Sequence, residues 1–205
     1  MKRFLILAAV MTAVIFTATA RHNDPVLMTI NGKDVHQSEF EYLYNKNRLQ
    51  QAEPQSFDEY LDMFIVFKLK VADAEAAGIH TTEAFRNEFE GYCAELAQPY
   101  EDAPSNPDYR NLVNEYRDGM LLFEISNRKV WEPASTDKAG LEEFFRSHHA
   151  NYQCDNPAEM SAMRNQIILD YQQELENKWV AELRCKYSVT IDKKLIERLY
   201  ISVSP

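Results

Sequence analysis

Residues 56–79 read SFDEYLDMFIVFKLKVADAEAAGI. Ser56 is a residue type that often starts a helix, and Gly78 is a residue type that often follows a helix end. Between them, apolar side chains fall on nearly every face of the helix, whereas a helix of a small domain usually has one apolar stripe. The stretch therefore predicts a central helix over residues 57–77 that other elements must cover on several sides.

Two short β-strands and a first helix are predicted ahead of this central helix. Val26–Ile30 is a β-like run, and the Asn31-Gly32 pair that follows it is a strong signal for a tight hairpin. Ser38 and Glu41 have the spacing of a capping box, so the first helix is expected to start at this serine.

The rest of the chain reads as further amphipathic helices separated by breaks. Their predicted ranges are 82–100, 110–131, 137–152 and 158–186, with a last helical turn or two over 195–200. The proline-rich segment 99–109 has no periodic pattern and predicts a loop. Residues 188–192, SVTID, alternate like a strand that we expect to pair with the N-terminal hairpin. The expected fold is mainly α-helical, with two or three short β-strands and a long C-terminal helix that packs back on the first helices.

Gly119 interrupts the predicted helix over residues 110–131. A glycine inside a helix costs about 1 kcal/mol relative to alanine. The position therefore predicts that a crossing helix approaches closely there.

The first 20 residues, MKRFLILAAVMTAVIFTATA, have the features of a secretory signal peptide. Two basic residues precede an apolar run, and Ala18-Thr19-Ala20 has the small-x-small pattern of a cleavage site. The run is shorter than the roughly 20 residues that span a bilayer. We therefore expect cleavage after Ala20, a periplasmic protein with one domain over residues 21–205, and no stable membrane insertion. An uncleaved anchor is the alternative.

Charge and cysteine content narrow the classes further. The formal net charge of −10 argues against binding to nucleic acid, whose phosphates need a basic surface. Of the three cysteines, Cys154 and Cys185 would lie roughly 40 Å apart at the two ends of the helix over 158–186, too far for a disulfide. A Cys93–Cys185 disulfide and three buried free thiols remain as alternatives.

No motif for catalysis or for metal binding is visible. The chain contains no HExxH, no GxSxG and no glycine-rich phosphate loop. His148 and His149 are adjacent on a predicted helix, so their side chains point about 100° apart and do not share a metal ion. We therefore expect no catalytic residue, no metal site and no cofactor.

Eleven Tyr, eleven Phe and seven Met suggest a surface that adapts to varied partners, because such side chains repack readily. The alternative is ordinary core packing, since a central helix surrounded by other helices explains the same pattern without a ligand.

Six segments in one order resemble the N-terminal chaperone module of secreted foldases of the SurA and PrsA type. The segments are VLMTINGKDVHQSEFEYLYN (26–45), YLDMFIVFKLKVADAEAAGI (60–79), FRNEFEGYCAELAQPY (85–100), EYRDGMLLFEISNRKVW (115–131), GLEEFFRSHHANY (140–152) and YQQELENKWVAELRCKYSVTID (171–192). The resemblance implies a helical body, closed by the last long helix and strand, that holds unfolded secreted or outer-membrane proteins in apolar grooves between helices.

The sequence departs from the family pattern where the family carries its parvulin-type peptidyl-prolyl isomerase domain. The resemblance implies an insertion between the helices that contain Tyr100 and Tyr116, but only the proline-rich loop 99–109 lies there. A compact domain of this kind needs on the order of 100 residues, so the family's catalytic residues have no counterpart in this chain.

The function predicted from these observations is that of a periplasmic holdase without isomerase activity. Residues predicted to line its client-binding groove are Tyr60, Phe64, Phe67, Met120 and Phe123. The alternative is an accessory subunit that pairs stably with a full-length foldase or with a second copy of itself.

Overall fold

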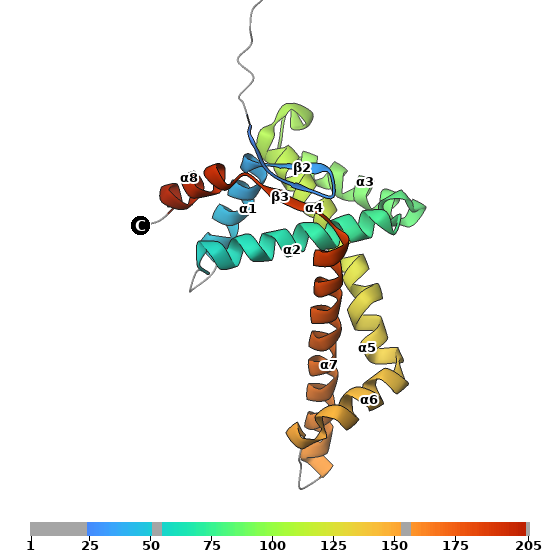
Figure 1. The fold of residues 1–205 in the computed structure, drawn as a ribbon. Coiled ribbons are helices and arrows are strands. Elements are labelled where there is room, and N and C mark those ends of the chain that lie inside the picture. Colours follow the sequence, from blue (N-terminus) through green and yellow to red (C-terminus); the bar gives the residue numbers. More distant parts are fainter. Residues whose placement is uncertain (1–23, 51–54, 153–156, 204–205) are drawn as a thin grey trace, which may run out of the picture.

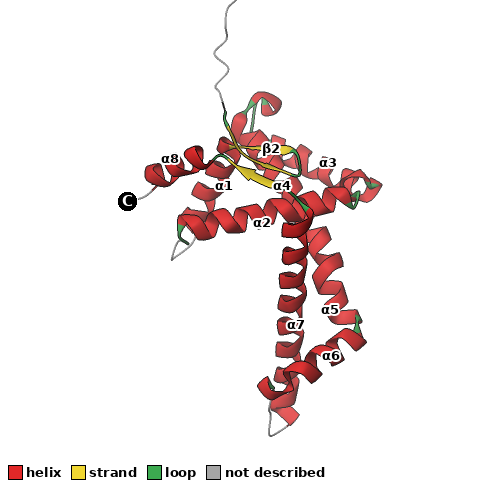
Figure 2. Cartoon of the chain, in the orientation of Figure 1, coloured by secondary structure: helices red, strands yellow, loops and turns green. Residues whose placement is uncertain are grey.

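The computed structural model describes residues 24–50, 55–152 and 157–203 of the 205-residue chain. It is mainly helical, with one small three-stranded antiparallel sheet (Figures 1 and 2). The predicted signal peptide and Cys154 lie outside the described residues.

The sheet joins the beginning and the end of the described chain. β1 (Val26–Ile30) and β2 (Lys33–His36) form the predicted hairpin, and both turn residues, Asn31 and Gly32, have positive φ angles of 51° and 77°. These angles are the ones that a tight two-residue hairpin turn requires. β3 (Val189–Ile191) pairs with the other edge of β1, which gives the strand order β2-β1-β3 and confirms the expected pairing of head and tail.

Helices make up the remainder of the structure. In chain order they are α1 (Gln37–Gln50), α2 (Phe57–Ala76), η1 (Ile79–Thr81), α3 (Glu83–Ala97), η2 (Ala103–Ser105), α4 (Pro107–Ser126), η3 (Asn127–Trp131), α5 (Glu132–Thr136), α6 (Lys138–His148), η4 (His149–Asn151), α7 (Pro157–Lys186) and α8 (Lys193–Val203). The segment 99–109, predicted as a loop, is partly helical. η2 forms within it, and α4 begins at Pro107 with Asn106 as its N-cap.

The ends of α2 confirm the prediction, whereas the start of α1 does not. Ser56 and Glu59 form a complete capping box, and Gly78 ends the helix with a φ angle of 72°. α1 already begins at Gln37, and both the backbone N–H and the hydroxyl of Ser38 donate to the carboxylate of Asp24, at 3.1 and 2.6 Å. The hairpin brings Asp24 back over the helix start, so this residue replaces the predicted serine cap.

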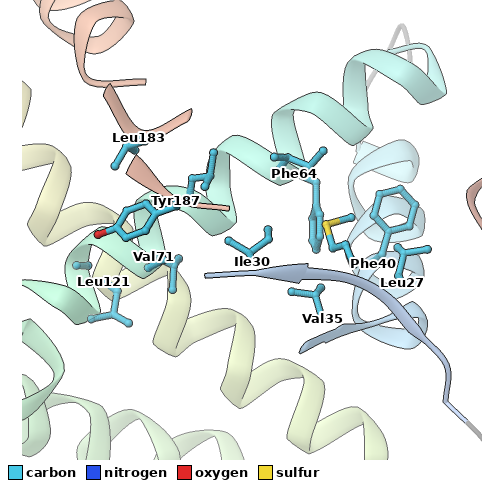
Figure 3. Packing of buried hydrophobic residues seen from close by; sticks show 14 of the residues in the cluster. Leu27, Ile30, Val35, Phe40, Phe64, Val71, Leu121, Leu183 and Tyr187 are labelled. Atoms are coloured by element: carbon cyan, nitrogen blue, oxygen red, sulfur yellow. The ribbon is translucent and has the colours of Figure 1, made fainter. Parts of the chain in front are cut away.

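The main hydrophobic core surrounds α2, as the all-round apolar pattern predicts (Figure 3). On one side Phe40 of α1 packs against Phe57 and Phe64, with ring centroids 5.7 and 5.2 Å apart. On other sides the core takes in Ile30 of β1 and Leu121 of α4. We call this part of the molecule, which includes the sheet, α1–α4 and α8, the body.

α7 belongs to two separate cores along its length. Its C-terminal part inserts Trp179 and Leu183 into the body, whereas Tyr171 packs with Phe144 of α6 and Ala134 of α5 in a second cluster. Together α5, α6 and the first part of α7 form an arm that extends away from the body (Figure 1). The expectation that the whole long helix packs back on the first helices is therefore correct only for its C-terminal part.

Cys93 and Cys185 do not form a disulfide, which was one of the two alternatives. Cys93 is half-buried and Cys185 is exposed, and both thiols are free. The Cys93–Cys185 disulfide is therefore wrong. The alternative of buried free thiols is also wrong for Cys185, because α7 presents that side chain to solvent.

A buried carboxylate holds the end of α7 against α2. The Nε1 atom of Trp179 donates to one oxygen of Asp73 at 3.1 Å, and Lys186 Nζ and Tyr187 Oη donate to the other at 2.7 and 2.9 Å. Burial by itself raises the pKa of Asp73, but these donors outweigh it and hold the pKa below its ordinary value of 3.8. We call these four residues the Asp73 cluster.

Replacing Asp73 with alanine is expected to lower the free energy of unfolding by about 3 kcal/mol, because two buried donors, on Trp179 and Tyr187, lose their acceptor and Lys186 loses its ion pair. Asp62→Ala is the matched control, since its carboxylate joins the same two helices by an exposed ion pair with Arg184. Its cost should stay below about 1 kcal/mol in urea unfolding. Equal costs for the two variants would contradict the role of the Asp73 cluster.

The Asp73 cluster should also make stability depend on pH in the acid range. Because the pKa of Asp73 is lower in the folded protein than in the unfolded chain, the carboxylate stabilises the fold above the ordinary value of 3.8. This contribution is lost as the pH falls through the folded pKa. Urea unfolding between about pH 7 and pH 2 should show the stability difference between wild type and Asp73→Asn narrowing below that value. A stability difference between the two proteins that stays constant over this pH range would contradict the stabilising role of the Asp73 carboxylate.

Candidate functional site

An open groove of about 1000 Å³ lies between α2, α3 and α4, with the second half of α1 closing part of it. It exists because α1, the sheet and α7 cover the other faces of α2, while α3 and α4 leave one face of that helix uncovered. Met63, Val66 and Phe67 of α2 lie on this face, and the side chain of Met63 is exposed. The groove surface is mostly apolar.

Aromatic side chains from α3 and α4 form the opposite side of the groove. Phe85 and Tyr92 come from α3, and Tyr116 comes from α4. The rings of Tyr92 and Tyr116 are in contact, with centroids 5.7 Å apart, so they tie α3 to α4 along the groove. Met120 adds a flexible side chain from the next turn of α4.

The structure brings the five predicted groove residues together, in three different environments. All of them line the groove. Tyr60 and Phe64 are almost fully buried, so they belong chiefly to the core beneath it, whereas Phe67 and Met120 are half-buried. Phe123 is exposed at the rim. Periodicity alone does not separate these environments, because core and groove residues recur with the same helical spacing.

Several groove residues were not predicted from the sequence. Met63 and Tyr116 line the groove, and the side chains of both are exposed. The signal that identifies them is tertiary: they fall on the one face of each helix that no other element covers. An all-round apolar helix indicates that some such face exists but not which one it is.

Gly119 lies in the groove lining, where no helix crosses α4. A Cβ atom at this position would meet no neighbouring atom within 4 Å. The predicted close approach of a crossing helix is therefore wrong. The missing side chain leaves room in the groove instead.

Gly119→Ala should raise the free energy of unfolding by about 1 kcal/mol, because alanine favours the helix and the new methyl group meets nothing. Gly140→Ala is the matched control in the arm, where the same methyl group would collide with Tyr171 Oη and the Asp137 side chain. That variant should be less stable than wild type. Thermal unfolding of both variants tests whether the space beside Gly119 is open. A loss of stability for Gly119→Ala would contradict this placement.

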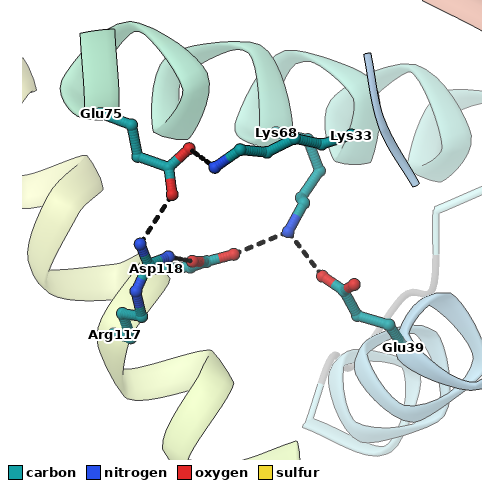
Figure 4. A network of polar contacts seen from close by, with 6 residues as sticks. All are labelled: Lys33, Glu39, Lys68, Glu75, Arg117 and Asp118. Carbon is teal, nitrogen blue, oxygen red and sulfur yellow. Dashed lines mark hydrogen bonds and ion pairs between the residues drawn. The ribbon is translucent and has the colours of Figure 1, made fainter. Parts of the chain in front are cut away.

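Ion pairs behind the groove fix the spacing of its walls (Figure 4). Lys68 of α2 bonds Glu39 of α1 at 2.6 Å and Asp118 of α4 at 2.7 Å. Arg117 of α4 bonds Asp118 at 3.0 Å and Glu75 of α2 at 2.6 Å. Lys33 of the hairpin also pairs with Glu75. The network links four elements on the side of α4 that faces away from the groove.

Lys68 stays charged in this network. Burial by itself lowers its pKa, but the adjacent carboxylates of Asp118 and Glu39 outweigh this effect and raise the pKa above the ordinary value. A charged lysine with two carboxylate partners holds α1, α2 and α4 at defined distances, since losing either partner would leave a charge poorly compensated.

The chemistry that the site offers is apolar contact. In the described ranges, no group of three His, Cys, Asp or Glu side chains is arranged to hold a metal ion. His148 stacks on Phe144 with ring centroids 4.4 Å apart and bonds the carbonyl oxygen of that residue, far along the arm. Among the described helices, none combines the length and the apolar character that crossing a bilayer requires.

Comparison with known proteins does not add to this picture. The chain matches no protein-family model, and a search of curated proteins finds no match either.

Proposed function

We propose that this protein is a non-catalytic chaperone of the holdase type, which binds unfolded polypeptide segments in the groove between α2, α3 and α4. The observation that carries the proposal is the groove itself: a mostly apolar, open surface on a body held by its own hydrophobic core and ion pairs. Its volume of about 1000 Å³ is at the upper end of the range for ligand pockets.

The chemistry of the lining suits transient binding to many clients. Fully burying one large apolar side chain contributes about 1.5–3 kcal/mol. Much of that gain is offset by the cost of ordering an unfolded segment, so binding is reversible and needs no ATP. Met63 and Met120 lie among aromatic rings, and their flexible side chains can adapt to different client sequences.

The resemblance to the chaperone module of SurA- and PrsA-type foldases supports the same function. The segments of this chain that carry the resemblance include the hairpin, α2, α4 and the closing strand β3, and these elements hold the groove in place. The connection between α3 and α4 is short and contains only η2, which is consistent with a holdase that lacks the isomerase domain. With the predicted signal peptide, the proposal places the mature protein in the periplasm and its clients among secreted and outer-membrane proteins.

Light scattering of a denatured envelope protein on dilution tests the proposal. The mature wild-type chain should suppress aggregation near equimolar ratio. Gly119→Trp should lose most of this effect, because the indole occupies the space that Gly119 leaves in the groove. Gly119→Ala is the control, since it changes the same position but keeps the groove open.

Thermal unfolding must show that both Gly119 variants are folded. No suppression by the wild type, or equal suppression by the alanine and tryptophan variants, would refute the groove as the holdase site. Capture from periplasm addresses the alternative of an accessory subunit. One stoichiometric foldase partner would favour that alternative, and many substoichiometric envelope proteins would favour the holdase.

A further inference from the structure

Phe123 and Trp131 form an exposed aromatic pair where α4 leads into the arm. Their ring centroids are 5.3 Å apart, and the ring planes make an angle of 62°. Phe123 is 59% exposed and lines the groove, and Trp131 is 40% exposed. The pair therefore extends the apolar surface of the groove beyond its rim.

A wide helical turn places these two rings together. Residues 127–131 form a π-helical turn, in which the N–H of Glu132 bonds the carbonyl of Asn127. Pro133 explains the turn, because a proline ring clashes with the carbonyl four residues earlier, here that of Lys129. Turns of this kind are rare and often occur at functional sites.

The register of the helix shows what the wide turn changes. In a regular α-helix, residues seven apart lie within about 20° of each other, and residues eight apart differ by about 80°. Val130 would then share the face of Phe123. The π-turn adds one residue, so Val130 is instead buried at 2% exposure and Trp131 takes the place beside Phe123.

Charges in the groove lining complement a basic ligand. Lys70 is bonded to Glu176, and Arg128 lies 3.9 Å from Glu124, so both basic side chains have acidic partners. Glu88 of α3 is exposed in the groove and has no hydrogen bond or ion pair within the described part of the chain. The net charge of −10 adds a negative long-range field that attracts cationic segments.

We propose that the groove and the aromatic pair together bind an extended unfolded segment in which an apolar side chain lies next to a lysine or arginine. The apolar side chain packs on Phe123 and Trp131, and the basic side chain pairs with Glu88. This inference rests on the proposed function and adds a client class to it: apolar segments with basic neighbours are preferred over apolar segments with acidic ones.

Three fluorescently labelled peptides test the inference, each with the same apolar residues, no tryptophan, and basic, neutral or acidic flanking residues. Anisotropy of the label gives the affinity for the mature chain. The basic peptide should bind more tightly than the acidic one, and the difference should shrink as salt is raised. Glu88→Gln should lower the affinity for the basic peptide by about threefold, the effect expected for the loss of a partly exposed ion pair. Glu90→Gln, on the same helix but outside the groove, is the control and should change nothing.

The two tryptophans of the chain make the aromatic pair directly observable. Trp179 is buried, so acrylamide quenches chiefly Trp131. A bound peptide should shield Trp131 from the quencher. Phe123→Ala combined with Trp131→Ala should weaken peptide binding by about fivefold, the scale of a lost aromatic contact. Phe145→Ala is the control, because this arm residue has the same exposed fraction as Trp131, 40%, and lies outside the groove.

The variant Pro133→Ala changes no aromatic ring and tests the geometry alone. Without this proline the helix can close its wide turn, which moves Trp131 away from Phe123. Peptide binding should then be weakened as much as in the double variant. Circular dichroism must show that the variant keeps its helix content.

Three outcomes would overturn the inference. Peptides could bind without shielding Trp131 and without sensitivity to Glu88, which would leave the holdase proposal intact. Trp131 could instead become shielded when the protein alone is concentrated, which would make a second copy the occupant. No binding of any peptide would remove the proposed function as well.

Discussion

The structure depends on one buried carboxylate that joins two distant parts of the chain. Asp73 lies near the end of α2 and accepts hydrogen bonds from Trp179, Lys186 and Tyr187, more than 100 residues further on. With the end of α7 fixed there, β3 follows directly along the free edge of β1. The same anchoring determines which face of α2 the end of α7 covers, and leaves a neighbouring face of α2 to α3, α4 and the groove. Burying the carboxylate of Asp73 is costly unless donors compensate its charge. Trp179, Lys186 and Tyr187 compensate it only in one position of α7, so the carboxylate specifies a single docking geometry for that helix.

Two further features keep the groove open rather than collapsed. The ion pairs centred on Lys68 and Arg117 set the distance between α2 and α4 from behind, where apolar packing alone would allow the helices to slide. Leu175 lies at the boundary between the core of the body and the core of the arm, and packs against both. The arm therefore starts from a fixed point, and the aromatic pair at its base keeps a defined position relative to the groove.

The sequence predicts the local structure of this protein better than it predicts which side chains are exposed at the surface. Asn31-Gly32 and the capping residues of α2 act within a few residues, so the hairpin and the central helix are predicted correctly. The cap supplied by Asp24 and the π-turn before Pro133 depend on contacts or hydrogen bonds that the periodic pattern does not reveal. For the same reason the five predicted groove residues all line the groove but mix core with surface, and they leave out Met63 and Tyr116. The arm was not predicted, because the apolar seam of α7 is continuous in sequence even though it serves two cores.

Site-specific photo-crosslinking tests the central claim most directly, namely that unfolded clients bind in the groove between α2, α3 and α4. A photoreactive residue at Met120, inside the groove, would be compared with one at Leu169, which is exposed on α7 and lies outside the groove. After dilution of a denatured envelope protein into the sample and illumination, the account predicts a covalent client adduct at position 120 and little or none at position 169. Adducts at position 169 with none at position 120 would contradict it.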